Sequence, residues 1–438
     1  MDAYAAYLDT ERRINEGLIR LDRSLGPACG YGPRPEERLE AMRDFLRRLG
    51  DPQRGIPAVH VVGTSGKGSV AAAIAGTLSA AGLRVGLHVS PYLQAMTEKI
   101  WIAGRFVSAE ELGALADAVL PIARPLLAAD APASVHGMAS TAMAFEAFRR
   151  ARVDAAVVEA GCGARYDLTS FADTRVAVAT NVGADHLDVL GPGVEQVAWH
   201  KAGVARRGKP VVVGAIGVAL DVFRREAASV GATLVEIPPA RDALSHNAAL
   251  AARAAALFGE HLGIEIGAQA ASESRARVKL ACRTEIVQEE PRVILDGAHN
   301  ADKIAVAIDG ALALATPGPR VAVVGLLAAK ASADLIRPLA SRFDAIWVTE
   351  PQVYGKRPLG TAEGISLLSS VGIEATGAAD PGEALDAAMA CAGPEGTVVV
   401  LGSFYLAGAL RERWYQKREV VLQRTSWPRR GGAQEPLA

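Results

Sequence analysis

The chain has 438 residues, of which 50% are hydrophobic and 22% are charged, and its 47 basic and 48 acidic residues leave a net charge of −1. This much apolar material supports large cores and excludes a largely disordered chain. The near balance of charge argues against a broad electrostatic surface for nucleic acid or anionic lipid. At roughly 100–200 residues per domain, the length predicts two or three domains.

The cysteines and the apolar segments favour a soluble cytoplasmic protein. The four cysteines are far apart and show no CxxC spacing, as expected of reduced thiols rather than of a disulfide framework or a zinc site. The first residues contain no basic segment followed by an apolar core, so no secretory signal is predicted. The longest apolar stretch, 396–410, contains three glycines and is too short to span a bilayer as a helix.

Short β-branched runs alternate with Ala/Leu-rich helical stretches along most of the chain. The runs are apolar on both faces, which is typical of parallel strands covered by helices on both sides. Their alternation with helices predicts right-handed βαβ units and an α/β fold. The predicted strands are 58–62, 84–89, 154–160, 175–182, 210–215, 232–237, 292–298, 320–327, 345–350 and 396–403.

The alternation pauses after residue 237, where a long helical stretch is followed by the polar, irregular segment 267–283. It resumes at residue 292, so each half is long enough to form its own sheet. The end of the chain is rich in Pro and Gly and lacks periodicity, which predicts disorder. The predicted divisions are a first domain over 1–270, a linker over 271–283, a second domain over 284–422 and a disordered tail over 423–438.

A glycine-rich turn joins the strand at 58–62 to an Ala-rich helix. Its glycines let backbone N–H groups converge on one point, and the helix N-terminus adds partial positive charge there. Lys67 can reach a terminal phosphate, and the Ser69 hydroxyl can ligate Mg²⁺. The spacing differs from GxxxxGK[ST], because position 61 is Val and Gly68 separates the lysine from the serine. The turn, predicted to bind nucleotide phosphates, consists of Gly63, Thr64, Ser65, Gly66, Lys67, Gly68 and Ser69.

Polar residues also follow later strands of the first half, where ligand sites form in open α/β sheets. Glu159 ends the strand at 154–160 and could ligate Mg²⁺, or be a surface acid. His186 follows the next strand and could ligate a metal, oriented by the neighbouring Asp185, or be structural. Lys201 is a candidate second cation or bridging group, with a solvated helix lysine as the alternative.

In the second half, Asp296, His299 and Asn300 follow the strand that starts at 292. The alternative interpretation is a polar turn that caps the next helix. Because both halves carry such a group at a strand end, we expect a cleft between two domains that closes for chemistry.

In this order, the motifs resemble those of the folylpolyglutamate synthase/dihydrofolate synthase family, a branch of the Mur ligase superfamily. The resemblance extends from about Leu18 to Leu410. It is carried by HVVGTSGKGS (60–69), SPYLQAMTEKI (90–100), VVEAGCGARYDLTS (157–170), TNVGADHLDVLG (180–191), KAGV (201–204), SHNAALA (245–251), CRTEIV (282–287), LDGAHN (295–300) and GSFYLAG (402–408).

The resemblance implies a P-loop, Mur-ligase-like domain with a parallel sheet and a smaller Rossmann-like C-terminal domain. It implies an ATP-dependent amide ligase in which an acid attacks the γ-phosphate and the amine of an amino acid then displaces phosphate. The implied cofactors are ATP and Mg²⁺, and the implied partners are a small-molecule acid and L-glutamate. It further suggests a monomer, and the charge balance and apolar segments described above predict a cytoplasmic protein that uses neither nucleic acid nor membrane.

The same resemblance assigns roles to individual residues. The implied catalytic residues are Lys67, Lys201, His186 and His299. The implied ATP-binding residues are Gly63, Thr64, Ser65, Gly66, Lys67, Gly68, Ser69, Asn247, Arg283 and Asp296. The implied metal ligands are Ser69, Ser90, Glu159, His186 and Lys201, the last as an anionic carbamate.

Departures from the family's motifs gather around the expected acceptor pocket. Tyr92 stands where the family has histidine, Thr97 and Lys99 stand where it has asparagine and arginine, and GM at 137–138 replaces FE. Changed polar groups in a pocket can alter substrate discrimination. The leading hypothesis, which follows from the resemblance, is ligation of glutamate to dihydropteroate or folate. The alternatives are a ligase of the same build for a different acid, and a nucleotide-binding protein without turnover.

Overall fold

The computed structural model describes residues 2–18, 35–128, 131–184, 186–267, 270, 278–353 and 356–429. The chain forms two compact units: Met1–Tyr92 with Met96–Leu280, and Leu93–Ala95 with Ala281–Ala438. The division after Leu280 falls within the predicted linker 271–283, of which residues 271–277 lie outside the described part. The segment Leu93–Ala95 belongs to the second unit, which the sequence did not predict.

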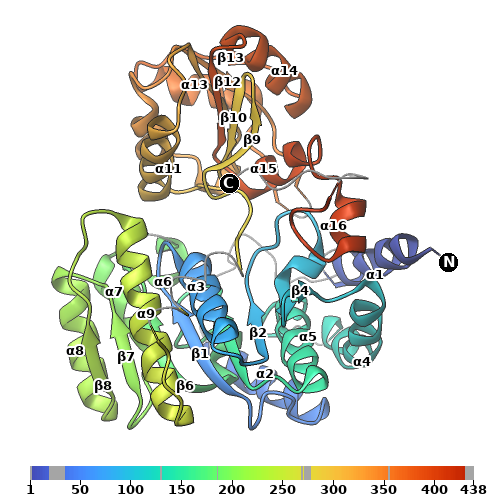
Figure 1. Ribbon diagram of the computed structural model, residues 1–438, viewed down its shortest axis with the longest axis vertical. Coiled ribbons are helices and arrows are strands. Elements are labelled where there is room, and N and C mark those ends of the chain that lie inside the picture. The colour runs from blue at the N-terminus through green and yellow to red at the C-terminus, as the bar shows by residue number, and fades with distance from the viewer. Residues whose placement is uncertain are drawn as a thin grey trace. The chain divides into compact units, whose positions relative to one another are not determined.

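The first unit is built on an eight-stranded sheet in the order β4-β3-β2-β5-β1-β6-β7-β8 (Figure 1). The pairs from β2 through β8 are parallel, whereas β2–β3 and β3–β4 are antiparallel and form one edge. Its strands are β1 (Pro57–Val62), β2 (Val85–His88), β3 (Ile100–Ile102), β4 (Arg105–Phe106), β5 (Ala155–Glu159), β6 (Asp173–Ala179), β7 (Pro210–Val213) and β8 (Thr233–Glu236). Its helices are α1 (Ala3–Leu18), α2 (Pro35–Arg48), α3 (Lys67–Ala80), α4 (Ala109–Leu127), α5 (Val135–Ala151), α6 (Leu187–Leu190), α7 (Val194–Ala202), α8 (Gly217–Val230) and α9 (Ala243–Leu262).

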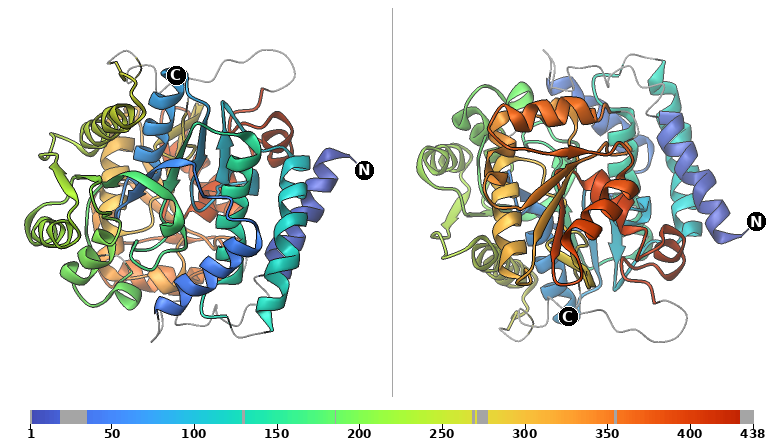
Figure 2. Two further views of the ribbon diagram at one scale, coloured as in Figure 1. Left: turned by 90° about the horizontal axis from the view of Figure 1, so that it is seen from below. Right: turned by 90° about the horizontal axis from the view of Figure 1, so that it is seen from above.

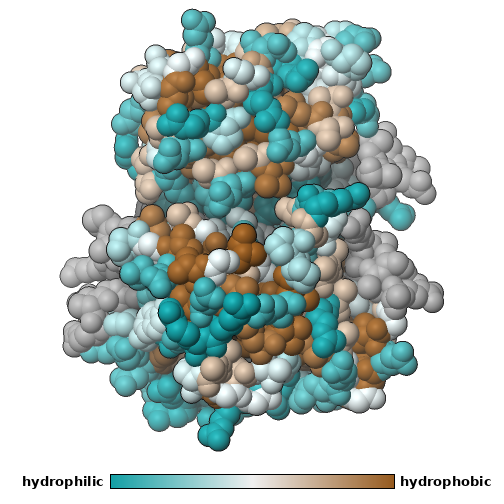
Figure 3. All heavy atoms as spheres, turned by 90° about the vertical axis from the view of Figure 1, so that its left-hand side faces the viewer, coloured by the Kyte–Doolittle hydropathy of each residue, from teal (hydrophilic) through white to brown (hydrophobic). Residues whose placement is uncertain are grey.

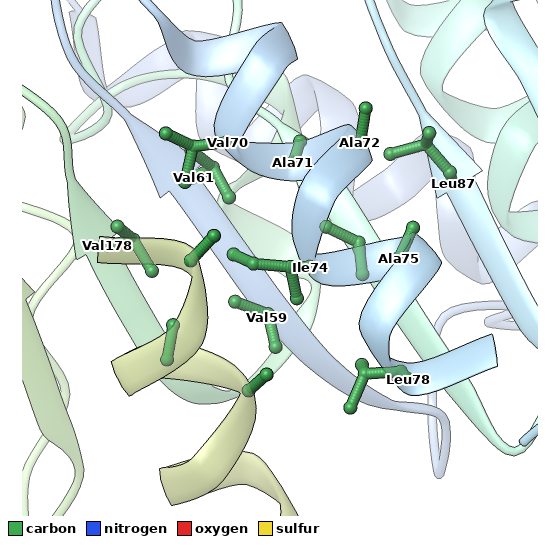
Figure 4. Packing of buried hydrophobic residues seen from close by; sticks show 14 of the residues in the cluster. Val59, Val61, Val70, Ala71, Ala72, Ile74, Ala75, Leu78, Leu87 and Val178 are labelled. Atoms are coloured by element: carbon green, nitrogen blue, oxygen red, sulfur yellow. The ribbon is translucent and has the colours of Figure 1, made fainter. Parts of the chain in front are cut away.

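Alternation along β1 and β6 fills both faces of this sheet. Successive side chains of a strand point to opposite faces, so Val59 and Val61 pack with Ile74 of α3 in one apolar cluster, as Figure 4 shows. Val62 belongs instead to the cluster on the other face, together with Phe223 of α8. Both clusters are buried, which explains why these strands read as continuous apolar runs.

Beyond the sheet, α1 and α4 lie side by side, and α4 also packs against α5 (Figure 2). Helix α4 begins with a capping box, in which Ser108 and Glu111 each accept a hydrogen bond from the other's backbone N–H. Such reciprocal bonds satisfy two amides that the first helical turn leaves without partners. The α4 boundary is thus fixed locally by the sequence.

The second unit contains a six-stranded sheet in the order β13-β12-β11-β14-β10-β9, parallel except for the β9–β10 pair. All ten strands predicted from the sequence are therefore confirmed, and the α/β class with them. Its strands are β9 (Glu285–Glu289), β10 (Arg292–Leu295), β11 (Arg320–Val324), β12 (Ala345–Val348), β13 (Thr376–Gly377) and β14 (Thr397–Leu401). Its helices are α11 (Ala301–Ala313), α12 (Ala333–Ile336), α13 (Thr361–Ser369), α14 (Pro381–Ala392), α15 (Phe404–Arg411) and α16 (Lys417–Gln423).

The predicted disordered tail, 423–438, begins too early. Gln423 still belongs to α16, and the Trp427 indole N–H donates a 2.7 Å hydrogen bond to Glu285. A half-buried aromatic anchor of this kind helps to offset the entropy of ordering the segment. Residues 430–438 lie outside the described part of the chain.

Apolar side chains are also exposed on the first unit. Figure 3 shows them among polar residues on the side of the molecule that carries α8 and α9 in Figure 1. Exposed apolar residues near the starts of these helices include Ile216, Val218 and Leu244. In the described part of the chain, no helix combines the length and the apolar character needed to cross a membrane.

Candidate active site

The glycine-rich turn between β1 and α3 forms a phosphate loop whose shape requires glycine at two positions. Gly63 has φ +149°, and a Cβ there would lie 1.8 Å from the Thr180 hydroxyl oxygen. Gly66 has φ +78° at the start of α3, and a Cβ there would lie 2.9 Å from the Asn247 amide. Asn247, predicted to contact ATP, therefore packs directly over the loop. The amides at the start of α3 remain available to an anion, as in other helix-N-terminal phosphate sites.

The segment that follows β6 braces the phosphate loop. The Ser65 N–H donates to the Asn181 side-chain oxygen at 2.7 Å, and the Thr64 N–H donates to the Asn181 carbonyl at 3.0 Å. The Thr180 hydroxyl donates to the Ser65 carbonyl at 2.6 Å, while the Gly183 N–H donates to the Thr64 hydroxyl at 3.0 Å. The brace was not predicted from the sequence, although the TN pair directly after a strand was a usable signal.

Two lysines converge on the backbone of this loop. Lys67 Nζ donates to the Gly63 carbonyl at 3.1 Å, and Lys201 Nζ donates to the same carbonyl at 2.8 Å. Lys201 comes from α7 and is only 3% exposed. The structure thus places Lys201 at the phosphate loop, which disfavours the alternative of a solvated helix lysine. Two cationic groups at one point favour a highly charged anion such as a triphosphate.

A carboxylate and a serine lie beside the loop at the ends of β5 and β2. Glu159 is 6% exposed, and its Oε2 accepts a hydrogen bond from the Ser90 N–H at 3.1 Å. The same oxygen would lie 3.4 Å from a Cβ added at Gly68, the residue before Ser69. The structure therefore brings Glu159, Ser90 and the start of α3 together, and Glu159 is not a surface acid.

This donor set suits a hard cation. In the described residues, no three His, Cys, Asp or Glu side chains gather into a metal-binding group. Mg²⁺ commonly uses one or two carboxylates and completes its shell with phosphate and water oxygens. Glu159 and the hydroxyls of Ser69 and Ser90 fit that pattern.

His186 is positioned by backbone geometry. It has φ 55° and precedes α6 as its N-cap residue. The hydrogen bonds between this segment and the phosphate loop include those of Gly183, three positions before His186. The sequence predicts that Asp185 orients the His186 ring, and Asp185 lies outside the described part of the chain. The role of His186 stays a prediction.

The second unit holds a separate polar cluster after β10. Asp296 is buried and accepts hydrogen bonds from the Thr284 N–H at 2.7 Å and the Ala298 N–H at 2.8 Å. Burial raises the pKa of Asp296 above its usual value, although the nearby Arg283 charge and these bonds oppose the shift. The Arg283 guanidinium lies over the Phe404 ring, 4.4 Å from its centroid.

His299 joins the same cluster, since its ring centroid is 5.9 Å from that of Phe404. Its Nδ1 lies 2.8 Å from the Gly297 carbonyl, which can only accept, so Nδ1 carries the proton and Nε2 can accept from Lys303 at 3.3 Å. Burial and the charges of Lys303 and Lys330 lower the pKa of His299 well below its usual value. The neighbouring Asn300 caps α11.

Two of the departures from the family's motifs, Tyr92 and Lys99, meet in one polar cluster of the first unit. Lys99 Nζ donates to the Ser140 hydroxyl at 2.6 Å and lies 6.0 Å from the centroid of the Tyr92 ring. The Tyr92 hydroxyl accepts from Asn15 at 3.0 Å, and Asn15 in turn contacts the His136 ring at 3.2 Å. Burial lowers the pKa of Lys99 to about 8. We name these five residues the Lys99 cluster.

Comparison with known proteins agrees with this geometry. Residues 282–404 match the Mur ligase glutamate ligase domain. The folylpolyglutamate synthase of Lacticaseibacillus casei is 30% identical over 84% of this chain and 92% of its own length. The dihydrofolate synthase/folylpolyglutamate synthase of Escherichia coli is 32% identical over 85% of this chain and 90% of its own length. The chain belongs to the folylpolyglutamate synthase/dihydrofolate synthase family.

Solved structures of the folylpolyglutamate synthase family share the fold. The Mycobacterium tuberculosis folylpolyglutamate synthase complexed with ADP superposes with a TM-score of 0.82 at 26% identity, over 94% of this chain and 99% of that one. Escherichia coli FolC in complex with DHPP and ADP superposes with a TM-score of 0.73 at 29% identity, over 85% of this chain and 92% of that one. The family resemblance and the predicted P-loop and Mur-ligase architecture are thereby confirmed.

Some members of the family are larger. A probable bifunctional folylpolyglutamate synthase/dihydropteroate synthase from Haloferax volcanii is 31% identical over 86% of this chain. The present chain spans only 48% of that relative's length. The match accounts for about half of the bifunctional relative.

Proposed function

We propose that this protein is an ATP-dependent ligase that joins the amine of L-glutamate to the carboxylate of a pterin- or folate-type acid. The observation that carries the proposal is the braced phosphate loop, with Lys67 and Lys201 on one carbonyl and Glu159 beside it. Relatives named as folylpolyglutamate and dihydrofolate synthases support the substrate class.

The proposed reaction has two balanced steps. A carboxylate oxygen of the acid attacks the γ-phosphorus of ATP, and the bond from that phosphorus to the β,γ-bridging oxygen breaks. ADP departs as the leaving group, and the acid becomes an acyl phosphate. The glutamate amine then attacks the acyl carbon, phosphate departs, and the nitrogen loses a proton. Phosphoryl transfer depends mainly on positioning and on neutralised charge. Lys67 and the α3 amides hold the phosphates in line for the first step.

The remaining residues bind and orient. Asn247 with Arg283 and Asp296 would hold the nucleoside, and the neutral His299 would face the incoming amino acid. Ser69, Ser90, Glu159, His186 and carbamylated Lys201 would hold Mg²⁺, which neutralises phosphate charge when bound. Closure of the two units would exclude water from the acyl phosphate. We further propose a cytoplasmic monomer.

A second candidate is the same ligase chemistry on a different acid. The Lys99 cluster supports it, because Lys99 and Tyr92 both depart from the family's motifs and lie in the same network. A buried ammonium without a carboxylate among these contacts suits an anionic or acceptor group on the substrate. A third candidate, a nucleotide-binding protein without turnover, predicts no phosphate release at all.

One assay separates the three candidates. Purified protein with ATP, Mg²⁺ and glutamate is offered a panel of acids that includes dihydropteroate and tetrahydrofolate. Phosphate release and an amide product with a pterin acid support the first candidate. Turnover with another acid alone supports the second, and tight ATP binding without any turnover supports the third.

Variants test the site itself. Lys67→Ala and Glu159→Ala should each lower turnover by at least about a hundredfold, because the first removes a cation at the phosphates and the second removes a proposed Mg²⁺ ligand. Lys209→Ala and Glu40→Ala are matched controls that remove the same groups elsewhere on the first unit. Near-normal rates for the site variants, with unchanged thermal unfolding, would refute the assigned roles.

A further inference from the structure

A cavity of about 380 Å³ lies in the first unit, away from the phosphate loop. Its walls come from α2, from the segment after β5, from the end of α7 and from α8. None of the loop residues 63–69 is among the described residues that line it. Its size falls within the range of small-molecule sites. The residues that line it include Arg43, Arg165, Phe171, Arg206, Glu226 and Val230.

Positive charge dominates this cavity. The lining residues in the described part of the chain include three arginines and a single carboxylate, Glu226, which pairs with Arg165. Arg206 donates hydrogen bonds to the backbone carbonyls of Gly203 at 2.8 Å and of Ser170 at 3.2 Å, which carry no full charge. Arg43 lies over Phe171, with 5.7 Å from its guanidinium carbon to the ring centroid. The lining therefore carries two more positive than negative charges.

Arg206 is the costly charge of this arrangement, because these hydrogen bonds go to neutral carbonyls rather than to an anion. Burial and the like charge of Arg165 lower the pKa of Arg206. Guanidinium groups present several N–H donors in a planar fork that matches phosphate and carboxylate oxygens. Phe171 and Val230 form an apolar part of the cavity wall, which reduces the volume of the cavity that a hydrated ion pair could occupy.

We infer that this cavity, named here the arginine cavity, binds a small oxyanion with at least two negative charges. The shared chemistry is that of a phosphate-type group or a compact dicarboxylate. The inference is independent of the proposed ligase activity, since none of the residues that carry it belongs to the site described above.

Occupancy has a built-in reporter at the end of α7. The Arg165 N–H donates to the His200 carbonyl at 2.9 Å, and its guanidinium donates to the Trp199 carbonyl at 3.1 Å. The guanidinium carbon also lies 3.9 Å from the centroid of the Trp199 ring. An anion that bonds to Arg165 draws the guanidinium away from Trp199, so its emission changes.

The test uses the full chain with Lys67→Ala, which weakens anion binding at the phosphate loop. Pyrophosphate and glutarate are titrated separately by calorimetry and by Trp199 emission, with Trp199→Phe to identify the signal. One saturable site is expected, weakened by added salt. Tighter binding of pyrophosphate identifies a phosphate-type ligand, and tighter binding of glutarate identifies a dicarboxylate.

Charge variants then locate the site. Arg43→Glu and Arg206→Gln should each raise the Kd roughly tenfold or more, because each removes a charged hydrogen-bond donor. Arg47→Gln and Arg207→Gln remove neighbouring arginines that do not line the cavity, and should leave the Kd within about twofold. Arg43 is exposed, so its replacement leaves the fold intact even where Arg206→Gln does not. Absence of saturable binding, or binding indifferent to Arg43→Glu, overturns the inference.

Discussion

Replacement of Asn181 by alanine tests whether the brace sets the nucleotide affinity of the phosphate loop. The Asn181 side-chain oxygen accepts from the Ser65 N–H at 2.7 Å, and the substitution leaves that amide without its partner. Loss of such a bond costs about 1–2 kcal/mol. If the cost falls on the loop conformation that binds phosphate, the Kd for ADP rises roughly 5- to 30-fold.

The assay is calorimetric titration with ADP at fixed Mg²⁺, accompanied by thermal unfolding. Thr174→Ala is the matched control, since it removes a buried hydroxyl from the opposite end of β6, where Thr174 bonds to the Ala172 carbonyl at 3.2 Å. The control should lower the unfolding temperature without changing the ADP affinity. An unchanged Kd for Asn181→Ala, or an equal loss in both variants, would refute the brace.

Two further predictions concern stability. Burial lowers the pKa of His60 to about 3, so between pH 6.5 and 3 the unfolded chain binds a proton that the folded chain does not. The free energy of unfolding should therefore decrease as the pH is lowered through this window, by up to about 1.4 kcal/mol per pH unit. His60→Gln should flatten that slope in urea unfolding, and an unchanged slope would contradict the assignment. Arg411 is fully buried and forms a bidentate pair with Glu285 at 2.7 and 2.9 Å. Arg411→Met should cost about 3–5 kcal/mol, measured the same way, whereas the exposed Arg413→Met should cost less than about 1 kcal/mol.

The sequence predicted those features that depend on local pattern. Each buried parallel strand is a continuous apolar run, and each is followed by a turn, so the ten strands were visible without long-range information. The same regularity placed Glu159 and the glycine-rich turn at carboxyl ends of strands, where the structure brings them together. Four strands were missed, namely β3, β4, β9 and β13. Three of them have only two or three residues, too few for a measurable periodicity, and β9 (EIVQE) contains only two apolar residues.

Contacts between distant residues escaped prediction for a different reason. The Gln94 side-chain oxygen accepts a hydrogen bond from Arg411 at 2.6 Å across 317 positions of sequence, and both residues belong to the second unit. A glutamine in an otherwise ordinary loop gives no sign of such a partner. The brace at Asn181 was easier to predict from the sequence, since Asn181 follows β6, a strand that pairs with β1.

The state of Lys201 decides how charge is distributed at the phosphate loop. As an ammonium, it adds a second cation beside Lys67 on the Gly63 carbonyl, and only Glu159 remains to attract Mg²⁺. As a carbamate, it becomes an anion, and the loop then holds one cation for the phosphates and two anions for the metal. Lys201→Arg distinguishes these states, because a guanidinium keeps the positive charge and cannot form the carbamate at neutral pH.

If Lys201 acts as a carbamate, Lys201→Arg should retain ADP affinity within about threefold while the Mg²⁺ concentration for half-maximal turnover rises at least tenfold. Intact mass of the unsubstituted protein should then show one added CO₂ that the variant lacks. If Lys201 acts as an ammonium, the arginine variant should keep most of its turnover and its Mg²⁺ dependence. That result, with an unmodified mass, would contradict the carbamate and leave Glu159 as the only anionic metal ligand of the proposed set.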